Sequence, residues 1–283
     1  MSAVRKTPEI AIVTDSTCDV PQELVKQYQI HVIPNIIVID GKSLEDGKDI
    51  SREQFYESLP RMKSMPTTAT ASSGSYQSEY EGLFRQGYRQ VISLHAASVL
   101  SGIYNAACIA AEAFENQVRV IDSQQLSMGL GFQVLAAAEA AANGAPLEHI
   151  LSVIADFHRR IRLYAMLDTL EYIRRSGRVS WARARLGDLL RIKPFIELRN
   201  GQVFSFGEAR TYQKGISRLY EFLIGLGPIE RLAILHTNAE EQARQFIASM
   251  DIAIPSPPLI VNVTTIIGTH VGPNGIGFTA VLA

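Results

Sequence analysis

The chain has 283 residues, more than a single hydrophobic core usually holds, so two domains are expected. Hydrophobic residues make up 47% and charged residues 19%, which supplies enough apolar material for packed cores and excludes a disordered chain. The formal net charge of -1 argues against a dedicated nucleic-acid-binding protein, because that class carries a basic excess.

Cysteine content and hydropathy indicate a protein of a reducing compartment. Cys18 and Cys108 are the only cysteines, and two thiols supply neither a disulfide framework nor a set of metal ligands. The first ten residues lack the apolar run of a signal peptide, and no later stretch reaches the ~20 apolar residues of a membrane span. We therefore expect a cytoplasmic protein without a metal site.

The first half of the chain alternates strand and helix patterns. Strands are expected at residues 9–15, 31–39, 91–94 and 118–122, and helices at 101–113, 131–142 and 146–160. Asp19 is expected to cap a helix that has Pro21 in its first turn, and Ser51 with Gln54 predicts a capping box. Residues 64–75, almost all small and hydroxylated, predict a loop. This alternation is typical of a parallel sheet covered on both faces.

The second half has a mixed α+β pattern. Strands are expected at residues 163–167, 194–198, 259–263 and 276–282. Asn200-Gly201 lies between two extended runs and predicts a hairpin, and Asn238 with Glu241 predicts a helix cap. We therefore expect two domains, residues 8–158 with a parallel sheet and residues 159–283 with a mixed sheet.

Four polar clusters follow expected strands of the first half. They are Thr14 to Thr17, Thr67-Thr68, Ser98 to Gly102, and Asp122-Ser123. In an open parallel sheet, ligands bind at the carboxyl ends of the strands, so these clusters predict one shared site. Asp15 has no metal-binding side chain at ligand spacing beside it, and a carboxylate that accepts N–H bonds from the next turn is the favoured role.

Two further segments carry candidate binding groups. Ser101 and Gly102 open a helix, where a hydroxyl, free N–H groups and the helix dipole suit a phosphate or a carboxylate; Ser101 can equally serve only as a cap. Residues 268–277, GTHVGPNGIG, place His270 among four glycines, with a site role and a structural role both open. The other histidines predict surface or packing roles; they are His31, His95, His149, His158 and His236.

A basic stretch lies in an expected helix-loop-helix of the second half. It contains Arg174, Arg175, Arg178, Arg183, Arg185 and Arg191. The stretch is either a solvated face or a docking surface for an acidic partner, with Ser176-Gly177-Arg178 as a tight turn that presents one arginine inward. The sequence contains no GxGxxG, GxxxxGK[ST], GxSxG or HExxH motif, and Ser101 has no evident partner base, so nucleophilic catalysis is not expected.

Taken in order, these segments resemble the DegV family of bacterial fatty-acid-binding proteins over nearly the whole chain. The matching segments are IAIVTDST (10–17), MPTTATAS (65–72), LSGIYNAA (100–107), VIDSQQLSMGLG (120–131), LDTLEYIRRSGRVS (167–180), LLRIKPFIEL (189–198), GEARTYQKGI (207–216) and IIGTHVGPNGIG (266–277). The sequence departs from the usual family pattern at Ile103, where SGT becomes SGI and one hydroxyl is lost.

The resemblance implies a two-lobed α/β fold, with an N-terminal parallel α/β/α sandwich, a C-terminal mixed-sheet α+β domain and the ligand between the lobes. It implies that Thr68 and Ser101, with Gly102 beside them, hold a fatty-acid carboxylate, and that His270 and Arg178 support them. A C14–C18 acid such as palmitate or oleate is the expected ligand, without any cofactor. Burial of a chain of ~14 methylenes would contribute roughly 11 kcal/mol to the binding free energy, before the entropy lost on ordering the acyl chain is subtracted.

The resemblance also implies a partner. Some family members carry lipid for a fatty acid kinase and present the carboxylate to a separate ATP-binding subunit, so this chain would itself be no enzyme. Transient membrane contact is compatible with such a carrier, and no nucleic acid is expected. Two alternatives stay open: a phosphotransferase or dihydroxyacetone-like kinase subunit using the SG turn for phosphate, and a regulatory module that contacts proteins through the basic stretch.

Overall fold

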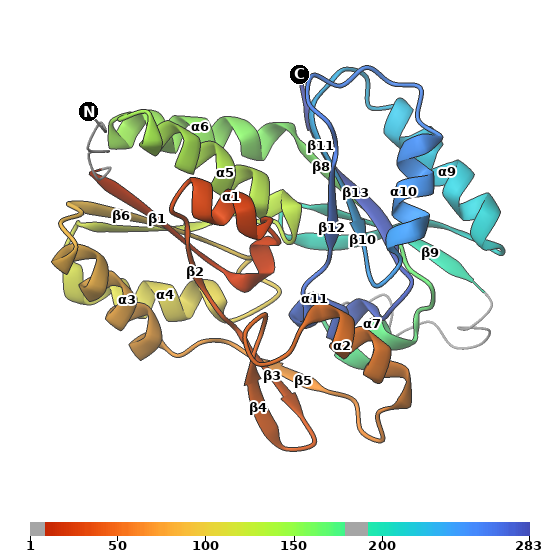
Figure 1. The fold of residues 1–283 in the computed structure, drawn as a ribbon, viewed down its shortest axis with the longest axis horizontal. Coiled ribbons are helices and arrows are strands. Elements are labelled where there is room, and N and C mark those ends of the chain that lie inside the picture. The colour runs from red at the N-terminus through yellow and green to blue at the C-terminus, as the bar shows by residue number, and fades with distance from the viewer. Residues whose placement is uncertain (1–8, 179–191) are drawn as a thin grey trace.

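The computed structural model describes residues 9–178 and 192–283. Its N-terminal lobe is built on a parallel sheet with the strand order β2-β1-β6-β7. The strands are β1 (Ile10–Asp15), β2 (His31–Ile33), β6 (Gln90–His95) and β7 (Val118–Asp122). The buried apolar runs of β1 and β6 are explained by helices on both faces of this sheet (Figure 1).

Helices of this lobe form two layers around the parallel sheet. They are α1 (Gln22–Gln27), α3 (Ser73–Arg85), α4 (Ile103–Ala111), α5 (Met128–Ala142) and α6 (Leu147–Arg160). Figure 1 shows α3 and α4 on one side of the sheet and α1, α5 and α6 on the other. Short 3₁₀ turns cover Ser16–Cys18, Leu59–Arg61 and Glu112–Phe114.

The C-terminal lobe is built on a six-stranded mixed sheet with the order β10-β9-β8-β13-β11-β12. Its strands are β8 (Ile161–Met166), β9 (Lys193–Arg199), β10 (Gln202–Ala209), β11 (Ile229–His236), β12 (Leu259–Asn262) and β13 (Ile276–Leu282). The helices described here are α7 (Glu171–Ser176), α9 (Tyr212–Ile224), α10 (Glu240–Ala248) and α11 (Thr265–Val271). The two expected sheet types are thus confirmed.

One hydrophobic core runs through both lobes, because α5 and α6 also contact strands of the second sheet. Leu163 of β8 and Leu235 of β11 belong to the same buried cluster as the strands of the parallel sheet. Arg231 of β11 further donates two hydrogen bonds to Glu139 of α5, at 2.8 and 2.7 Å. The division at residue 158 stays a prediction.

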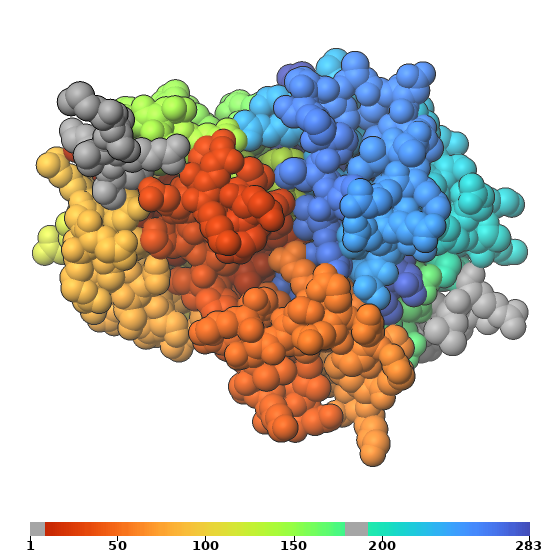
Figure 2. Space-filling view, in the orientation of Figure 1, coloured from red at the N-terminus to blue at the C-terminus, as the bar shows by residue number. Residues whose placement is uncertain are grey.

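A third, small antiparallel sheet has the order β4-β3-β5, and Figure 2 shows its region (orange) protruding between the lobes. It consists of β3 (Ile36–Ile39), β4 (Lys42–Glu45) and β5 (Thr67–Ala69). The helix α2 (Arg52–Ser58) lies between β4 and β5 in the sequence. The single strand expected at 31–39 was wrong, because Pro34 cannot donate a ladder hydrogen bond and the chain leaves one sheet there to enter another.

Local signals gave mixed results. The Ser51–Gln54 capping box is confirmed, and so is the Asn200-Gly201 hairpin, in which both residues have positive φ (50° and 74°) as a type I′ turn requires. The loop expected at 64–75 instead contains β5 and the start of α3, since β3 pairs with Thr67–Ala69. Tertiary pairing overrode the weak local preference of that small-residue segment.

Two expected helix caps were wrong. Pro21, not Asp19, precedes α1, and the buried Asp19 instead accepts hydrogen bonds from Ser127 and the backbone of Thr264. The side chain of Asn238 does not cap α10; its backbone N–H donates to Asn262. Both residues adopt positive φ, which Asp and Asn tolerate, so they serve as turns between elements rather than as helix starts.

Candidate functional site

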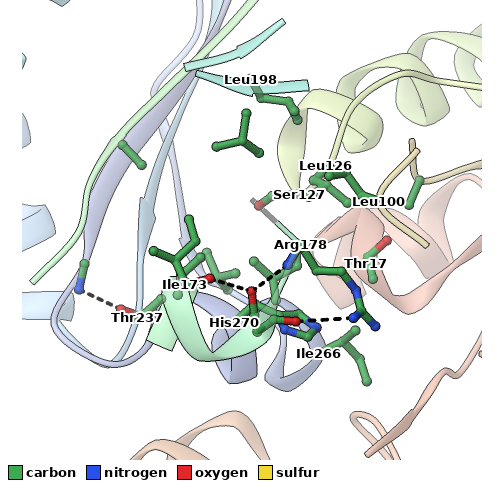
Figure 3. Close-up of a pocket in the computed structure, with 18 of the residues that line it drawn as sticks. Thr17, Leu100, Leu126, Ser127, Ile173, Arg178, Leu198, Thr237, Ile266 and His270 are labelled. Atoms are coloured by element: carbon green, nitrogen blue, oxygen red, sulfur yellow. Dashed lines mark hydrogen bonds between the residues drawn. The ribbon is translucent and has the colours of Figure 1, made fainter. Parts of the chain in front are cut away.

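A cavity of about 200 Å³ lies between the lobes, and most of its wall is apolar. The C-terminal lobe contributes Leu163, Ile173, Leu198, Leu235 and Ile266 from five different elements. Figure 3 shows Ile173, Leu198 and Ile266 around the cavity, with Leu100 and Leu126 of the N-terminal lobe across from Ile173. Such a surface suits a hydrocarbon chain, because the transfer of the chain out of water lowers the free energy and the chain needs no hydrogen bonds from the wall.

The polar part of the cavity contains Thr68 and His270, although 202 positions separate them in the chain. The Thr68 hydroxyl lies 3.2 Å from His270 Nε2. Burial, and then the positive charge of Arg178, lower the pKa of His270 to about 4, so the imidazole is neutral at pH 7. A neutral ring and a hydroxyl share one hydrogen bond here and can still offer a donor to a ligand.

Helix α11 brings His270 to this position because it packs against the third sheet and α2. Ile266 belongs to a cluster with Ile37 and Phe55. Gly268 is required at this contact, because a Cβ there would lie 2.3 Å from the Tyr56 hydroxyl. That hydroxyl donates to the carbonyl of Val263 at 2.9 Å and so fixes the start of α11. The glycine-rich segment 268–277 is therefore helical as far as Val271, and His270 lies in the last turn of α11.

Two aspartates of the N-terminal half anchor the start of α11. Asp19 accepts a hydrogen bond from the Thr264 backbone N–H at 2.9 Å and lies 3.0 Å from Arg52. Asp46 accepts hydrogen bonds from the hydroxyls of Thr264 and Thr265. Burial raises the pKa of Asp19 to about 6, although Arg52 opposes this change. These contacts couple the sheet that carries Thr68 to the helix that carries His270.

Ser101 and Gly102 form the turn before α4 and both line the cavity. The Ser101 Oγ accepts a hydrogen bond from the Ile103 N–H at 3.4 Å. This bond uses a lone pair, so the Ser101 O–H can donate into the cavity while the residue also supports its own helix. A Cβ at Gly102 would only touch Thr70, at an ordinary 3.7 Å, so the backbone does not require glycine there.

Arg178 lines the cavity and is exposed, which places it at an opening to solvent. Gly177, in the left-handed conformation at φ 69°, ends α7 and turns the chain toward it. The Arg178 guanidinium donates to the Ser176 carbonyl at 3.3 Å (Figure 3). Of the expected basic stretch, Arg175 forms an ion pair with Glu171 at 2.6 Å, and Arg183, Arg185 and Arg191 lie outside the described residues.

The expected clusters contribute unequally to the cavity. Thr17, Thr68 and Ser101 line it, whereas Asp122 and Ser123 do not. Asp122 instead accepts hydrogen bonds from Ser98 and from the backbone of Gln124, so it stabilises the loops after β6 and β7. The carboxyl ends of neighbouring strands do meet at one edge, but only some of their side chains point into the cavity.

Several polar lining residues were missed by sequence reasoning. They are Asn35, Ser127, His236 and Thr237. His236 was expected to be a surface or packing residue, but it ends β11 and its Nδ1 accepts from the Ala239 N–H at 3.1 Å. The strand β11 was not among the expected strands; the apolar run before His236 was the available signal, since strand ends of the second sheet also face the cavity.

His95 has a larger role than packing. It is fully buried, and its Nδ1 lies 3.0 Å from an Asp15 carboxylate oxygen. Its Nε2 lies 2.7 Å from the Ser93 hydroxyl, which lies 2.7 Å from the Tyr80 hydroxyl. Asp15 also accepts the Thr17 N–H at 3.0 Å, as expected for a carboxylate that supports the next turn. The pairing with His95 could not be foreseen, because 80 positions separate the two residues.

No cluster of side chains suited to a metal ion occurs among residues 9–178 and 192–283. In the same part of the chain, no helix is long and apolar enough to cross a membrane.

The fold and the cavity define a class of two-lobed α/β proteins with an apolar ligand slot between a parallel and a mixed sheet. The model of the DegV family, whose members are described as uncharacterised proteins, matches residues 9–282. The chain belongs to the DegV family.

Relatives of known name cover almost the whole chain. A DegV domain-containing protein of Caldanaerobacter subterraneus subsp. tengcongensis is 36% identical, with 95% of this chain and 97% of the relative aligned. Protein DegV of Bacillus subtilis is 34% identical over 95% and 97% of the two chains. The family expectation from the ordered motifs is thus confirmed.

Solved structures confirm the fold. A DegV family protein from Thermus thermophilus, described in terms of its fatty acid binding, has a TM-score of 0.89 at 29% identity and covers 97% of this chain and 99% of its own. DegV from Bacillus subtilis, described as a fatty acid binding protein, has a TM-score of 0.86 at 33% identity over 97% and 99% of the two chains.

Proposed function

We propose that this protein binds one long-chain fatty acid in the cavity between its lobes. Thr68, Ser101, Gly102 and His270 hold the carboxylate, and Arg178 supports it from the opening. The main support for this proposal is the cavity itself, an apolar slot whose polar end contains hydroxyls and a neutral imidazole from distant parts of the chain. The fatty-acid-binding descriptions of two similar proteins support the same ligand class.

The apolar wall and the polar groups of the cavity would have different roles in binding. Each methylene that leaves water contributes ~0.8 kcal/mol, so the apolar wall supplies affinity. A carboxylate loses its hydration there, and that cost is offset only where several donors meet it. The Thr68 and Ser101 hydroxyls and the N–H groups at the start of α4 are such donors, so they would fix the orientation of the acid.

The ligand can be identified directly. Denaturing mass spectrometry of the purified protein should release a C14–C18 acid at about one molecule per chain, the stoichiometry expected for binding in this cavity. Stripped protein should then take up added palmitate or oleate. Repeated preparations that contain no acid and take up neither one would refute the proposal.

A finer part of the proposal is that the protein presents the carboxylate to a separate ATP-binding kinase subunit. The exposed position of Arg178 supports this step, because a partner can reach that opening. Loaded protein, the kinase subunit and ATP should form an acyl phosphate that hydroxylamine traps as a hydroxamate. Lipid binding without any hydroxamate would leave a carrier and remove the kinase step.

A self-contained phosphotransferase is the competing function. Incubation with labelled ATP or phosphoenolpyruvate and dihydroxyacetone, without any partner, separates the two. Transfer of label would favour the phosphotransferase, whereas the carrier should transfer none.

A further inference from the structure

The buried carboxylate of Asp15 accepts hydrogen bonds from several parts of the N-terminal lobe. Its Oδ1 accepts from the Thr17 backbone and from the Asn35 amide, at 3.0 and 3.1 Å. Its Oδ2 lies 3.0 Å from His95 Nδ1 and accepts the Ala96 N–H at 3.3 Å. Burial acts to raise the pKa of Asp15, but hydrogen bonds from His95 and Thr17 outweigh it, and the pKa lies below its ordinary value. The group is therefore an ionised carboxylate that can only accept.

This carboxylate decides which atoms Thr17 and Asn35 can offer to the cavity they line. The Thr17 hydroxyl donates its proton to Asp15 Oδ1, so its oxygen keeps only lone pairs. The Asn35 Nδ2 donates to the same oxygen, and flipping the amide would set Oδ1 against a carboxylate. Asn35 is fully buried, and its Oδ1 meets no donor within the described parts of the chain.

These acceptors line the same cavity as the donor groups of the proposed head-group site. Asn35 directly precedes Ile36, which pairs with Ala69, the neighbour of Thr68. Figure 3 draws Thr17 on the same side as Leu100 and Leu126, across from Ile173. The cavity wall thus has two kinds of polar surface, one that donates hydrogen bonds and one that only accepts them.

We propose that Thr17 and Asn35 form a second polar subsite, which accepts a hydrogen bond from an O–H or N–H group on the ligand. This inference rests on the proposed function. A bare carboxylate offers only lone pairs and leaves the Asn35 oxygen unsatisfied, which a buried site does not tolerate without cost. Two sources have the required chemistry: the head group itself, as a protonated acid or a primary amide, and a hydroxyl on the acyl chain next to it.

Matched ligands distinguish these sources by competition against a fluorescent fatty acid on the wild-type protein. Palmitamide and methyl palmitate differ in a head-group donor, and 2-hydroxypalmitate and 2-methoxypalmitate differ in a chain donor. In at least one pair, the donor-bearing ligand should bind about tenfold more tightly. Equal affinities within both pairs, as a bound water that serves every ligand would produce, overturn the subsite.

Asn35→Leu should remove most of the difference within the responding pair. Asn105→Leu, at an exposed position of α4, should leave it unchanged as a control. A persistent difference in Asn35→Leu would contradict the assignment, and if that variant does not fold, Thr17→Val and the wild-type pairs still decide. Failure of the proposed function is recognised separately, because no competitor, palmitate included, would then bind.

Discussion

The two hydroxyls of the proposed head-group site allow a quantitative test. Thr68 and Ser101 lie on different elements, β5 and the turn before α4, and both line the cavity. Replacement by Thr68→Val and Ser101→Ala removes both O–H donors while keeping nearly the same volume. Thr68→Val removes the contact with His270, but the hydrogen bonds of Asp19 and Asp46 to the start of α11 stay, and Ser101 only accepts from Ile103 of its own turn.

The expected loss follows from the hydrogen bonds that the carboxylate would forfeit. Each bond to a charged group contributes about 1.5–3 kcal/mol, and the N–H groups at the start of α4 replace part of it, so the double variant should lose ~2–4 kcal/mol. This corresponds to a roughly 30- to 1000-fold increase in the Kd of palmitate. Binding should weaken mainly through faster dissociation, since the donors act only on the docked acid.

Displacement of a fluorescent fatty acid at equilibrium measures this change. Thr67→Val is a matched control, because Thr67 neighbours Thr68 on β5 but is exposed and does not line the cavity. The control should bind palmitate like the wild type, and all three proteins should have similar melting temperatures. A double variant that keeps wild-type affinity would show that these hydroxyls do not hold the carboxylate.

Three further predictions concern stability. Because the pKa of His270 is lowered in the folded protein, the unfolded chain without ligand takes up this proton at a higher pH than the folded one. The contribution of His270 to the free energy of unfolding should be complete above pH 6.5 and should fall by at most about 3 kcal/mol on acidification toward pH 4. Urea titrations of His270→Gln should lack this pH-dependent contribution. If the wild type and His270→Gln show the same pH dependence, this reading of the site is wrong. Gly201→Ala should cost about 1–2 kcal/mol because of its positive φ and the Val99 side chain near the added Cβ, and an unchanged midpoint of urea unfolding would refute the turn argument. Ser51→Ala should cost about 1 kcal/mol through loss of the capping box, and an unchanged melting temperature would contradict this role of Ser51.

Most regular elements could be predicted because their signals are local. The strand at Val118–Asp122 and the strand at Ile276–Leu282 agree with the sequence pattern, since short apolar runs between turn residues define them. The Asn200-Gly201 hairpin follows from the positive φ that both residues tolerate. The third sheet was missed because β5 consists of small, hydroxylated residues and forms only by pairing with β3.

Sequence reasoning singled out some residues of the candidate site but neither all of them nor their arrangement. Thr68, Ser101 and His270 were singled out by local chemistry, and all three line one cavity. Asn35 carried no signal, since an asparagine after a proline is typical of an ordinary turn. Its value as an acceptor arises only because Asp15 binds its amide group.

The sequence by itself determined many of the strands and helices, the mixed character of the second half and the family, because each depends on local patterns or ordered motifs; β11, α9 and the third sheet were not among the expected elements. The tertiary structure decided where the polar groups point. The contact between Thr68 and His270 depends on α11 packing against β3 and β5, through Gly268 beside Tyr56 and through Asp19 and Asp46 at its start. Such contacts join residues some 200 positions apart, and no local preference encodes them.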